Sequence, residues 1–169
     1  MYQTGETVVY GTTGVCIISE ITTQIFDGKP VEYYVLKPVT GQESTVFVPV
    51  HNEKLTRNFR HVLSKDEMEK FIFTFPDLPV IWTENEEERK LTYKDALGSA
   101  PRDTLISMIK GIWEHSMALR QKGKKLHIAD ERFFHEAEKM IYSEIAYVLG
   151  MDRNEVPSYI RSVLHIEME

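Results

Sequence analysis

The dipeptide Asp27-Gly28 is the feature that most constrains the fold of this chain. It lies between two runs rich in strand-forming residues, 15–26 and 31–37. Asp-Gly suits the two positive-φ positions of a type I′ turn, the connection that best matches the twist of paired antiparallel strands. The two runs are therefore predicted to form a hairpin. Strand-forming residues occupy both the odd and the even positions of the second run, so we expect both faces of this strand to be partly covered.

The flanking residues predict further strands of the same sheet. Val8-Val9-Tyr10 precedes the hairpin, and 44–50 follows it after a turn predicted at Thr40-Gly41-Gln42. Pro49 lacks an N–H for a ladder hydrogen bond and is expected at a strand end. A short turn and a fifth strand are expected within 51–64. Small turns without intervening helices predict a small, strongly bent antiparallel sheet or barrel.

The parity of the first hairpin strand predicts which of its side chains share a face. Val15, Ile17 and Ile21 have the same parity, so we expect them on one face of the sheet. Cys16 is the single cysteine, and we expect it to be a buried, small hydrophobic side chain rather than a reactive thiol. A single cysteine excludes an internal disulfide framework and suits a reducing cytoplasm.

From Ser64 onward the sequence has helical patterning. Ser64 and Glu67 have the spacing of a capping box at a helix start. The expected helices begin near Lys65, Thr83, Pro101, Asp130 and Asp152, with breaks at 75–79, at 98–101 and at Gly150. The sequence therefore predicts an α+β fold with a β domain at 1–62 and an all-α domain of about four to five helices at 64–169.

Composition narrows the possible functions. The net charge of −6 argues against independent nucleic-acid binding, because non-specific affinity comes from Lys and Arg neutralising phosphates. No apolar run is long enough to cross a bilayer, and the first residues lack a signal-peptide pattern. The six histidines have no metal-binding spacing, and neither a phosphate-binding loop nor a nucleophile elbow occurs. We expect a protein without enzymatic activity, cofactor, membrane contact or small-molecule substrate.

The residue spacing in the β domain resembles that of a known family. The residues concerned are Gly5-x-Thr7-Val8-Val9-Tyr10, Gly14, Gly28, Glu32-Tyr33-Tyr34-Val35-Leu36-Lys37 and Thr45-Val46-x-Val48-Pro49. They resemble the RNA-polymerase-interacting domain of the CarD-like bacterial transcription regulators, which is also found in transcription-repair coupling factors. The helical part is similar at Trp82, Leu97-Gly98-Ser99, Ile112-Trp113 and 126–145. The resemblance implies a Tudor-like or SH3-like barrel followed by a helical DNA-contacting domain, and favours a stand-alone regulator.

In this family the barrel docks on the protrusion lobe of the RNA polymerase β subunit. The resemblance places the polymerase-binding residues at Thr23, Gln24, Ile25, Val46, Phe47 and Val48. Gln24 and Phe47 stand where basic residues are common in the family. Docking by this chain is therefore expected to be more apolar, and an ordinary sheet position is the alternative for both residues.

In the same family a tryptophan of the helical module wedges into the minor groove at the upstream edge of the melted promoter bubble. The resemblance assigns this role to Trp82, with phosphate contacts at Arg89 and Lys90. An indole can enter a base step whose stacking is already broken at little cost. A Trp82 packed between helices is the alternative, and the glutamates that follow it would repel phosphate. Trp113 lies in an amphipathic helical pattern and is expected in the core.

The dense basic stretch at 120–127 has two interpretations. Its lysines Lys122, Lys124 and Lys125 either form a solvated loop that complements the preceding helix C-terminus or contact phosphate. The composition, the domain organisation and the family resemblance together predict a cytoplasmic transcription regulator that is associated with the nucleoid through RNA polymerase. It would bind the polymerase β subunit, contact promoter DNA weakly and only with polymerase, and modulate open-complex stability. The alternative is an interaction module without DNA contact.

Overall fold

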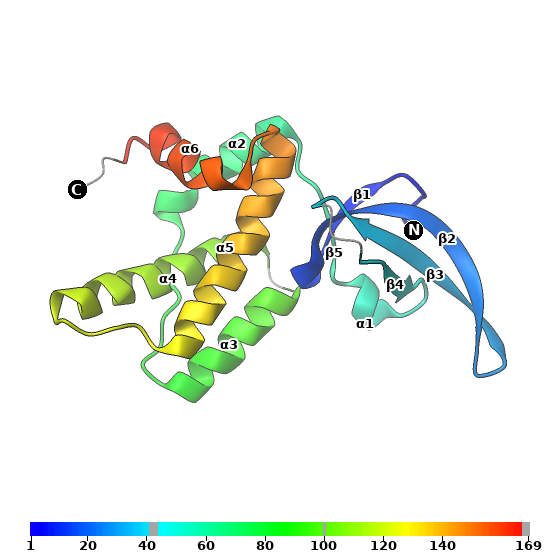
Figure 1. The fold of residues 1–169 in the computed structure, drawn as a ribbon, viewed down its shortest axis with the longest axis horizontal. Helices are drawn as coiled ribbons and strands as arrows, with labels where there is room; N and C mark the ends of the chain where they lie inside the picture. Colours follow the sequence, from blue (N-terminus) through cyan, green and yellow to red (C-terminus); the bar gives the residue numbers. More distant parts are fainter. Residues whose placement is uncertain (41–43, 100, 167–169) are drawn as a thin grey trace. The chain divides into compact units, whose positions relative to one another are not determined.

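The chain forms two compact units. The computed structural model describes residues 1–40, 44–99 and 101–166, so Gly41-Gln42 of the expected turn and Ala100 of the expected break lie outside the described residues. The units are Met1–Leu63 and Ser64–Glu169. The first is built on strands and the second on helices (Figure 1).

The first unit is a five-stranded antiparallel sheet with the strand order β4-β3-β2-β1-β5. Its elements are β1 (Thr7–Tyr10), the 3-10 turn η1 (Gly11–Thr13), β2 (Gly14–Phe26), β3 (Lys29–Pro38), β4 (Val46–Pro49), α1 (Glu53–Thr56) and β5 (Phe59–His61). β2 is the long curved strand in Figure 1. This bent sheet confirms the expected small antiparallel fold, and β5 is the predicted fifth strand.

Asp27-Gly28 forms the tight hairpin that the sequence predicts. The φ angle is 49° at Asp27 and 72° at Gly28, and a type I′ turn requires positive values at both positions. Phe26 is paired with Lys29 across the turn, and the pairing continues as far as Cys16 opposite Pro38. The turn thereby sets the register of β2 against β3.

A β-bulge at Ser19 changes the parity of β2. Ile18 is paired with Leu36, but the next pair joins Glu20 to Val35, which leaves Ser19 as the extra residue. The Ser19 Oγ donates a hydrogen bond to the Val35 carbonyl at 3.1 Å. One inserted residue exchanges the two faces of the strand beyond it.

The predicted grouping of Val15, Ile17 and Ile21 on one face was wrong because of this bulge. Cys16 and Ile18 point to the core before the bulge, Ile21 does so after it, and Ile17 is exposed. The buried core residues are Val8, Cys16, Ile18, Tyr34, Leu36, Val48 and Phe59. Burial raises the pKa of the Cys16 thiol to about 11, in agreement with the expected buried hydrophobic role.

The second unit contains the predicted helices. They are α2 (Lys65–Phe73), the 3-10 turn η2 (Phe75–Asp77), α3 (Glu86–Ser99), α4 (Arg102–Gln121), α5 (Ile128–Leu149), the 3-10 turn η3 (Arg153–Glu155) and α6 (Val156–Val163). However, α3 begins at Glu86 rather than near Thr83, and it includes Gly98 and Ser99 of the expected break. The Ser64 N–H donates to the Glu67 carboxylate at 2.8 Å, and the Glu67 N–H donates to the Ser64 Oγ at 3.3 Å. Gly150 ends α5 in the left-handed conformation, with φ 68°.

Helices α3, α4 and α5 supply the main core of the second unit. Its buried residues are Tyr93, Ala96, Leu97, Leu105, Met108, Ile112, Ala137 and Met140. Trp113 is not part of this core, because 55% of its surface is exposed, so its predicted core position was wrong. Ile112 takes the inward position instead, since successive residues of a helix point about 100° apart.

Candidate interaction surfaces

In the part of the first unit that the structure describes, β4 is an edge strand of the sheet. The Val50 N–H donates to the Glu32 carbonyl at 2.9 Å. Hydrogen bonding alternates along an antiparallel pair, so Val46 and Val48 direct their backbone groups toward β3. The N–H and C=O of Phe47 therefore point away from the sheet. An edge of this kind can accept a strand of another protein.

The Phe47 side chain lies on the face of the sheet opposite the core, which we call the outer face. Its ring meets that of Tyr33 edge-on, with centroids 6.3 Å apart and planes at 84°, and 47% of the residue is exposed. Gln24 is paired with Val31, two residues from Tyr33, and shares this face. The outer face thus combines an apolar end at β4 with a polar end at β2.

The other four predicted polymerase-binding residues have the opposite orientation. Val46 and Val48 pack with the core, and the Val48 side chain is completely buried. Thr23 and Ile25 lie on the core-facing side of β2 but beyond the end of the core, where Ile25 is strongly exposed. The structure therefore does not bring the six residues together on one face, and only Gln24 and Phe47 lie on the outer face.

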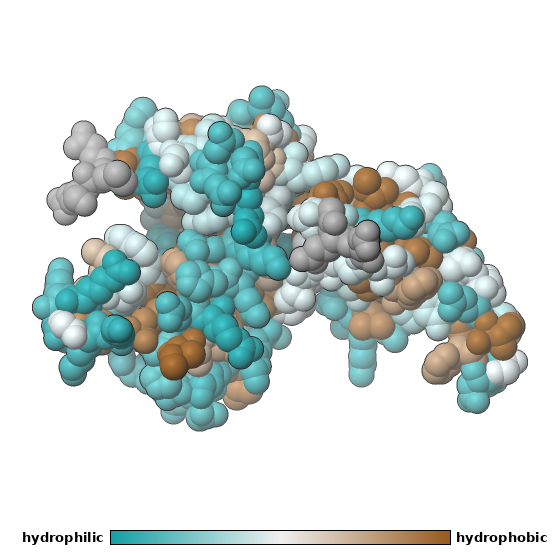
Figure 2. Space-filling view, in the orientation of Figure 1, coloured by the Kyte–Doolittle hydropathy of each residue, from teal (hydrophilic) through white to brown (hydrophobic). Residues whose placement is uncertain are grey.

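The far end of the β2–β3 hairpin has further exposed apolar surface. Ile25 and Phe26, next to the turn, are 72% and 68% exposed, and hydrophobic atoms are visible at this end of the hairpin in Figure 2. An open groove lies beside it, lined by Thr23, Pro30, Val31, Glu32, Pro49, His51, Asn52, Glu53 and Lys54. β4 pairs with residues 33–36 of β3, and Val50 continues the contact to Glu32, so residues 29–31 of the hairpin extend beyond β4.

In the second unit, the segment before α3 is held tightly against α4. The Ile81 N–H donates to the Ser107 carbonyl at 3.1 Å, and the Tyr93 hydroxyl donates to the Ile81 carbonyl at 3.0 Å. A Cβ at Gly111 would lie 2.1 Å from the Ile81 carbonyl oxygen, so glycine is needed for this close approach. Burial raises the pKa of Tyr93, which keeps its hydroxyl a neutral donor. The residue after Ile81 is thereby fixed in position.

That residue is Trp82, whose indole is held between two side chains. The His115 ring is stacked on it, with centroids 3.9 Å apart and planes at 18°. The guanidinium carbon of Arg89 lies 4.2 Å from the indole centroid. Two planar groups this close cannot share one face, so they cover opposite faces. The Trp82 Nε1 donates to Glu84 at 3.1 Å, and the half-buried indole reaches the surface in part.

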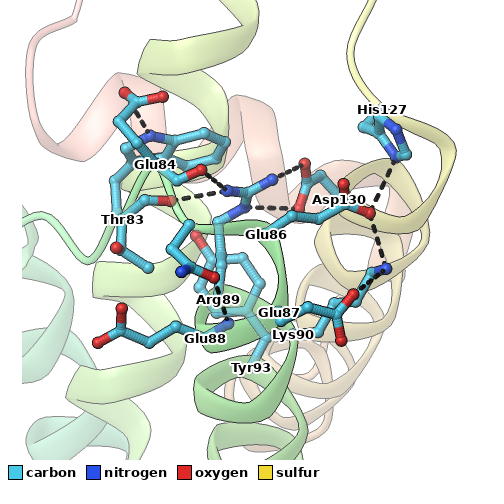
Figure 3. A network of polar contacts seen from close by, with 12 residues as sticks. Thr83, Glu84, Glu86, Glu87, Glu88, Arg89, Lys90, Tyr93, His127 and Asp130 are labelled. Atoms are coloured by element: carbon cyan, nitrogen blue, oxygen red, sulfur yellow. Dashed lines mark hydrogen bonds and ion pairs between the residues drawn. The ribbon is translucent and has the colours of Figure 1, made fainter.

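Arg89 is buried in an ion pair with Asp130. Its Nε and one Nη donate to the two Asp130 carboxylate oxygens at 2.9 and 2.8 Å, and the other Nη donates to the Thr83 carbonyl at 2.7 Å (Figure 3). The two side chains are only 7% and 3% exposed. Hydrogen bonding to Asp130 raises the pKa of Arg89, so the arginine stays charged. A phosphate contact by Arg89 would require this pair to break.

Lys90 remains at the surface but has acidic neighbours. Its Nζ lies 2.7 Å from Glu86 and 3.3 Å from Glu87, and the hydrogen bond to Glu86 raises the pKa of Lys90. Glu86 also lies 3.8 Å from His127 Nδ1 (Figure 3). The acidic run at the start of α3 is thus partly neutralised by local cations, and Lys90 is only partly available to phosphate.

Lys122, Lys124 and Lys125 lie in the exposed connection between α4 and α5. The Lys124 N–H donates to the Leu119 carbonyl at 2.9 Å, and Gly123 adopts a φ of 68°, so the connection folds back on the end of α4. Among residues 1–40, 44–99 and 101–166, none pairs with these lysines as a counter-ion. Their charges are therefore open to an external anion.

The first unit has the properties of a protein-interaction domain, since it is a small bent sheet with an exposed edge and a partly apolar outer face. Residues 2–61 match the family model of the CarD-like/TRCF RID domain. The first unit is therefore similar to this domain family, and the match confirms the resemblance seen in the β domain of the sequence. The match supports an RNA-polymerase-interacting module with a role in transcription.

The described residues contain no group of three or more His, Cys, Asp or Glu side chains placed to hold a metal ion. None of their helices combines the length and hydrophobicity that crossing a membrane requires.

Sequence reasoning missed three residues that shape these surfaces. Asp130 was expected only as a helix start, and nothing in the sequence connects it to Arg89, 41 positions away. His115 carries no signal for its stacking on Trp82. The exposure of Trp113 has a weak signal in the sequence, because the adjacent Glu114 interrupts the apolar pattern.

Proposed function

We propose that this chain is a non-enzymatic transcription regulator that docks on the protrusion lobe of the RNA polymerase β subunit through its first unit. Its second unit contacts promoter DNA near the upstream edge of the bubble and alters the stability of the open complex. The observation that carries the proposal is the match of residues 2–61 to the RID domain family. This function places the protein in the cytoplasm, associated with the nucleoid through polymerase.

The polymerase-binding surface that we propose is centred on Phe47. Phe47 combines outward-pointing backbone groups with a half-exposed aromatic ring, so strand addition and apolar contact can occur at one residue. Gln24 lies on the same outer face and supplies a neutral hydrogen-bonding group. Docking at this surface depends more on apolar burial than on charge, because neither residue is basic.

The DNA-contacting surface that we propose is centred on Trp82. Its two faces are covered by His115 and Arg89, so the indole would act as a rigid wedge rather than as a stacking platform. Arg89 acts here as a positioning residue, and Lys90 and the lysines at 122–125 remain for phosphate. Such contacts are few in an acidic chain, but docking on polymerase raises their local concentration, so weak contacts suffice.

Binding of the full chain to the purified β protrusion lobe tests the first half of the proposal. Phe47→Glu should weaken binding at least about tenfold, the effect typical of a central interface residue. The matched control is Phe73→Glu, which makes the same change at an exposed phenylalanine of the second unit and should leave binding intact. Equal effects of the two variants, or no binding of the unmodified chain, would refute the docking surface.

Open-complex lifetime on a promoter tests the second half. Trp82→Ala should abolish the effect of the chain on this lifetime while binding to the β lobe persists. Leu91→Ala, at an exposed apolar residue of α3, is the control and should keep the effect.

A second candidate function is an interaction module without DNA contact. The burial of Arg89 and the packing of Trp82 between side chains favour it. It predicts that Trp82→Ala has the same effect as Leu91→Ala in the lifetime assay, so the same experiment separates the two functions.

A further inference from the structure

The exposed indole of Trp113 lies at a small apolar hollow on the second unit. Trp113 is 55% exposed and Met117, one helical turn later, is 38% exposed. The hollow has a volume of about 90 Å³ and is lined by Ile112, Trp113, Ser116, Met117, Arg120, Leu126 and Phe134. α4 therefore presents an aromatic ring to solvent beside an apolar recess, about two helical turns before the basic connection.

Cations border this hollow. Arg120 is part of its lining, and Lys125 is adjacent in sequence to Leu126, which also lines it. Lys122 and Lys124 belong to the same connection, which folds back on the end of α4 through the hydrogen bond from Lys124 to Leu119. These lysines pair with no carboxylate within the described parts of the chain. An exposed aromatic ring is thus combined with unneutralised positive charge.

We propose that Trp113 and the lysines of the α4–α5 connection form a binding surface for single-stranded nucleic acid. An unpaired base stacks on an exposed aromatic ring, while its phosphates are neutralised by adjacent Lys and Arg, and this combination typifies single-strand binding. A duplex keeps its bases stacked inside and cannot offer a free base to Trp113. The charge on this surface selects a polyanion over an apolar protein segment.

This inference rests on the proposed function in one respect, because polymerase docking is what would deliver the surface to melted promoter DNA. The contact is weak in an acidic chain, but it can be tested without polymerase at low salt, where phosphate contacts are strongest. The sequence has two tryptophans, so in a Trp82→Phe background all tryptophan emission comes from Trp113. Failure of this test and failure of the Phe47 docking test are therefore independent results.

The experiment is a fluorescence titration of the Trp82→Phe chain with a short oligothymidylate at low salt. We expect saturable quenching of Trp113 emission by the single strand, and much weaker quenching by a blunt duplex of the same length. The logarithm of the binding constant should fall with the logarithm of salt concentration, with a slope of about −0.7 for each phosphate contact. Absence of quenching, or equal quenching by duplex and single strand, would overturn the proposal.

Two variants separate stacking from charge. Trp113→Ala should weaken binding of a labelled oligothymidylate about tenfold, as loss of one base–aromatic stack does. Replacing Lys122, Lys124 and Lys125 by glutamine should weaken binding and flatten its salt dependence. The matched control replaces the exposed Lys65, Lys70 and Lys94 by glutamine, with the same change in net charge. Equal effects of the two triple variants would refute a localised site.

A protein partner at this surface is the competing outcome. It would appear as a change in Trp113 emission on adding the β lobe without nucleic acid, together with no response to oligothymidylate. That pair of results would replace the nucleic-acid surface by a protein-docking surface.

Discussion

Replacement of Asp130 by alanine tests how strongly the buried ion pair stabilises the helical unit. Asp130 and Arg89 are joined by hydrogen bonds of 2.9 and 2.8 Å and are 3% and 7% exposed. Removing the carboxylate leaves the guanidinium buried without its counter-charge, because its other partners, the backbone carbonyls of Thr83 and Glu84, are neutral. Breaking buried pairs in this way costs about 3–5 kcal/mol. We expect Asp130→Ala to lower the free energy of unfolding of the second unit by this amount.

Urea unfolding followed by tryptophan emission measures the effect. Both tryptophans of the chain lie in the second unit, so the signal reports on that unit alone. A loss of about 3–5 kcal/mol is a large part of the stability of an ordinary domain, about 5–15 kcal/mol. The emission of native Asp130→Ala should also change, since Arg89 lies 4.2 Å from the Trp82 indole and loses its anchor.

The double variant Arg89→Met/Asp130→Leu provides the decisive comparison. It removes both charges, so it should be clearly more stable than Asp130→Ala, as apolar replacements of buried ion pairs usually are. Asp95→Ala, at an exposed aspartate of α3, should change stability little. The stabilising role of the ion pair would be refuted if Asp130→Ala unfolded like Asp95→Ala, or if the double variant were no more stable than the single one.

Three further perturbations have defined outcomes. Gly111→Ala places a Cβ 2.1 Å from the Ile81 carbonyl oxygen. It should lower the free energy of unfolding, measured by urea titration, by about 1–3 kcal/mol. Gly98→Ala is the control, because its Cβ meets open space, and it should leave this free energy unchanged. Burial raises the pKa of the Cys16 thiol to about 11 in the folded chain, whereas the thiol of the unfolded chain ionises at a lower pH. The contribution of Cys16 to the free energy of unfolding is therefore fully present below the unfolded pKa and is lost as the pH rises toward about 11. Urea midpoints measured across this range should fall more steeply in the unmodified chain than in Cys16→Ala, and parallel curves would contradict the assignment. Lys110→Met removes hydrogen bonds from Nζ to three backbone carbonyls of 75–78, so amide hydrogen exchange just after α2 should accelerate; exchange rates equal to those of the unmodified chain would argue against this role.

Local signals in the sequence predicted most of the strands and turns of the first unit. They failed for the side-chain orientation of β2 beyond the bulge at Ser19. Asp27-Gly28 determines its own turn, because few other residue pairs adopt two positive φ angles readily. Parity reasoning assumes an uninterrupted pleat, however, and Ser19 breaks it. The bulge is stabilised by a hydrogen bond to Val35 on another strand, so its position depends on a pairing that the local sequence does not contain.

The candidate sites were predicted less completely, because their chemistry depends on long-range partners. Trp82 was identified through a family resemblance, but the sequence could not decide between a free wedge and a packed indole. Arg89 was expected at the surface, and its distant partner Asp130 instead draws it into the interior. Trp113 was expected in the core, but α4 packs on the core through the face that carries Ile112, which leaves Trp113 exposed.

The sequence by itself determined the features that depend on neighbouring residues: the hairpin turn, the Ser64 capping box, the end of α5 at Gly150 and the division into a β unit and a helical unit. Their hydrogen bonds and backbone angles involve residues only a few positions apart. The tertiary structure alone decided which charges are neutralised and which aromatic rings are exposed. Burial and ion pairing depend on which residues meet across the fold, and a pairing such as Arg89 with Asp130 exists only after α3 and α5 have packed together.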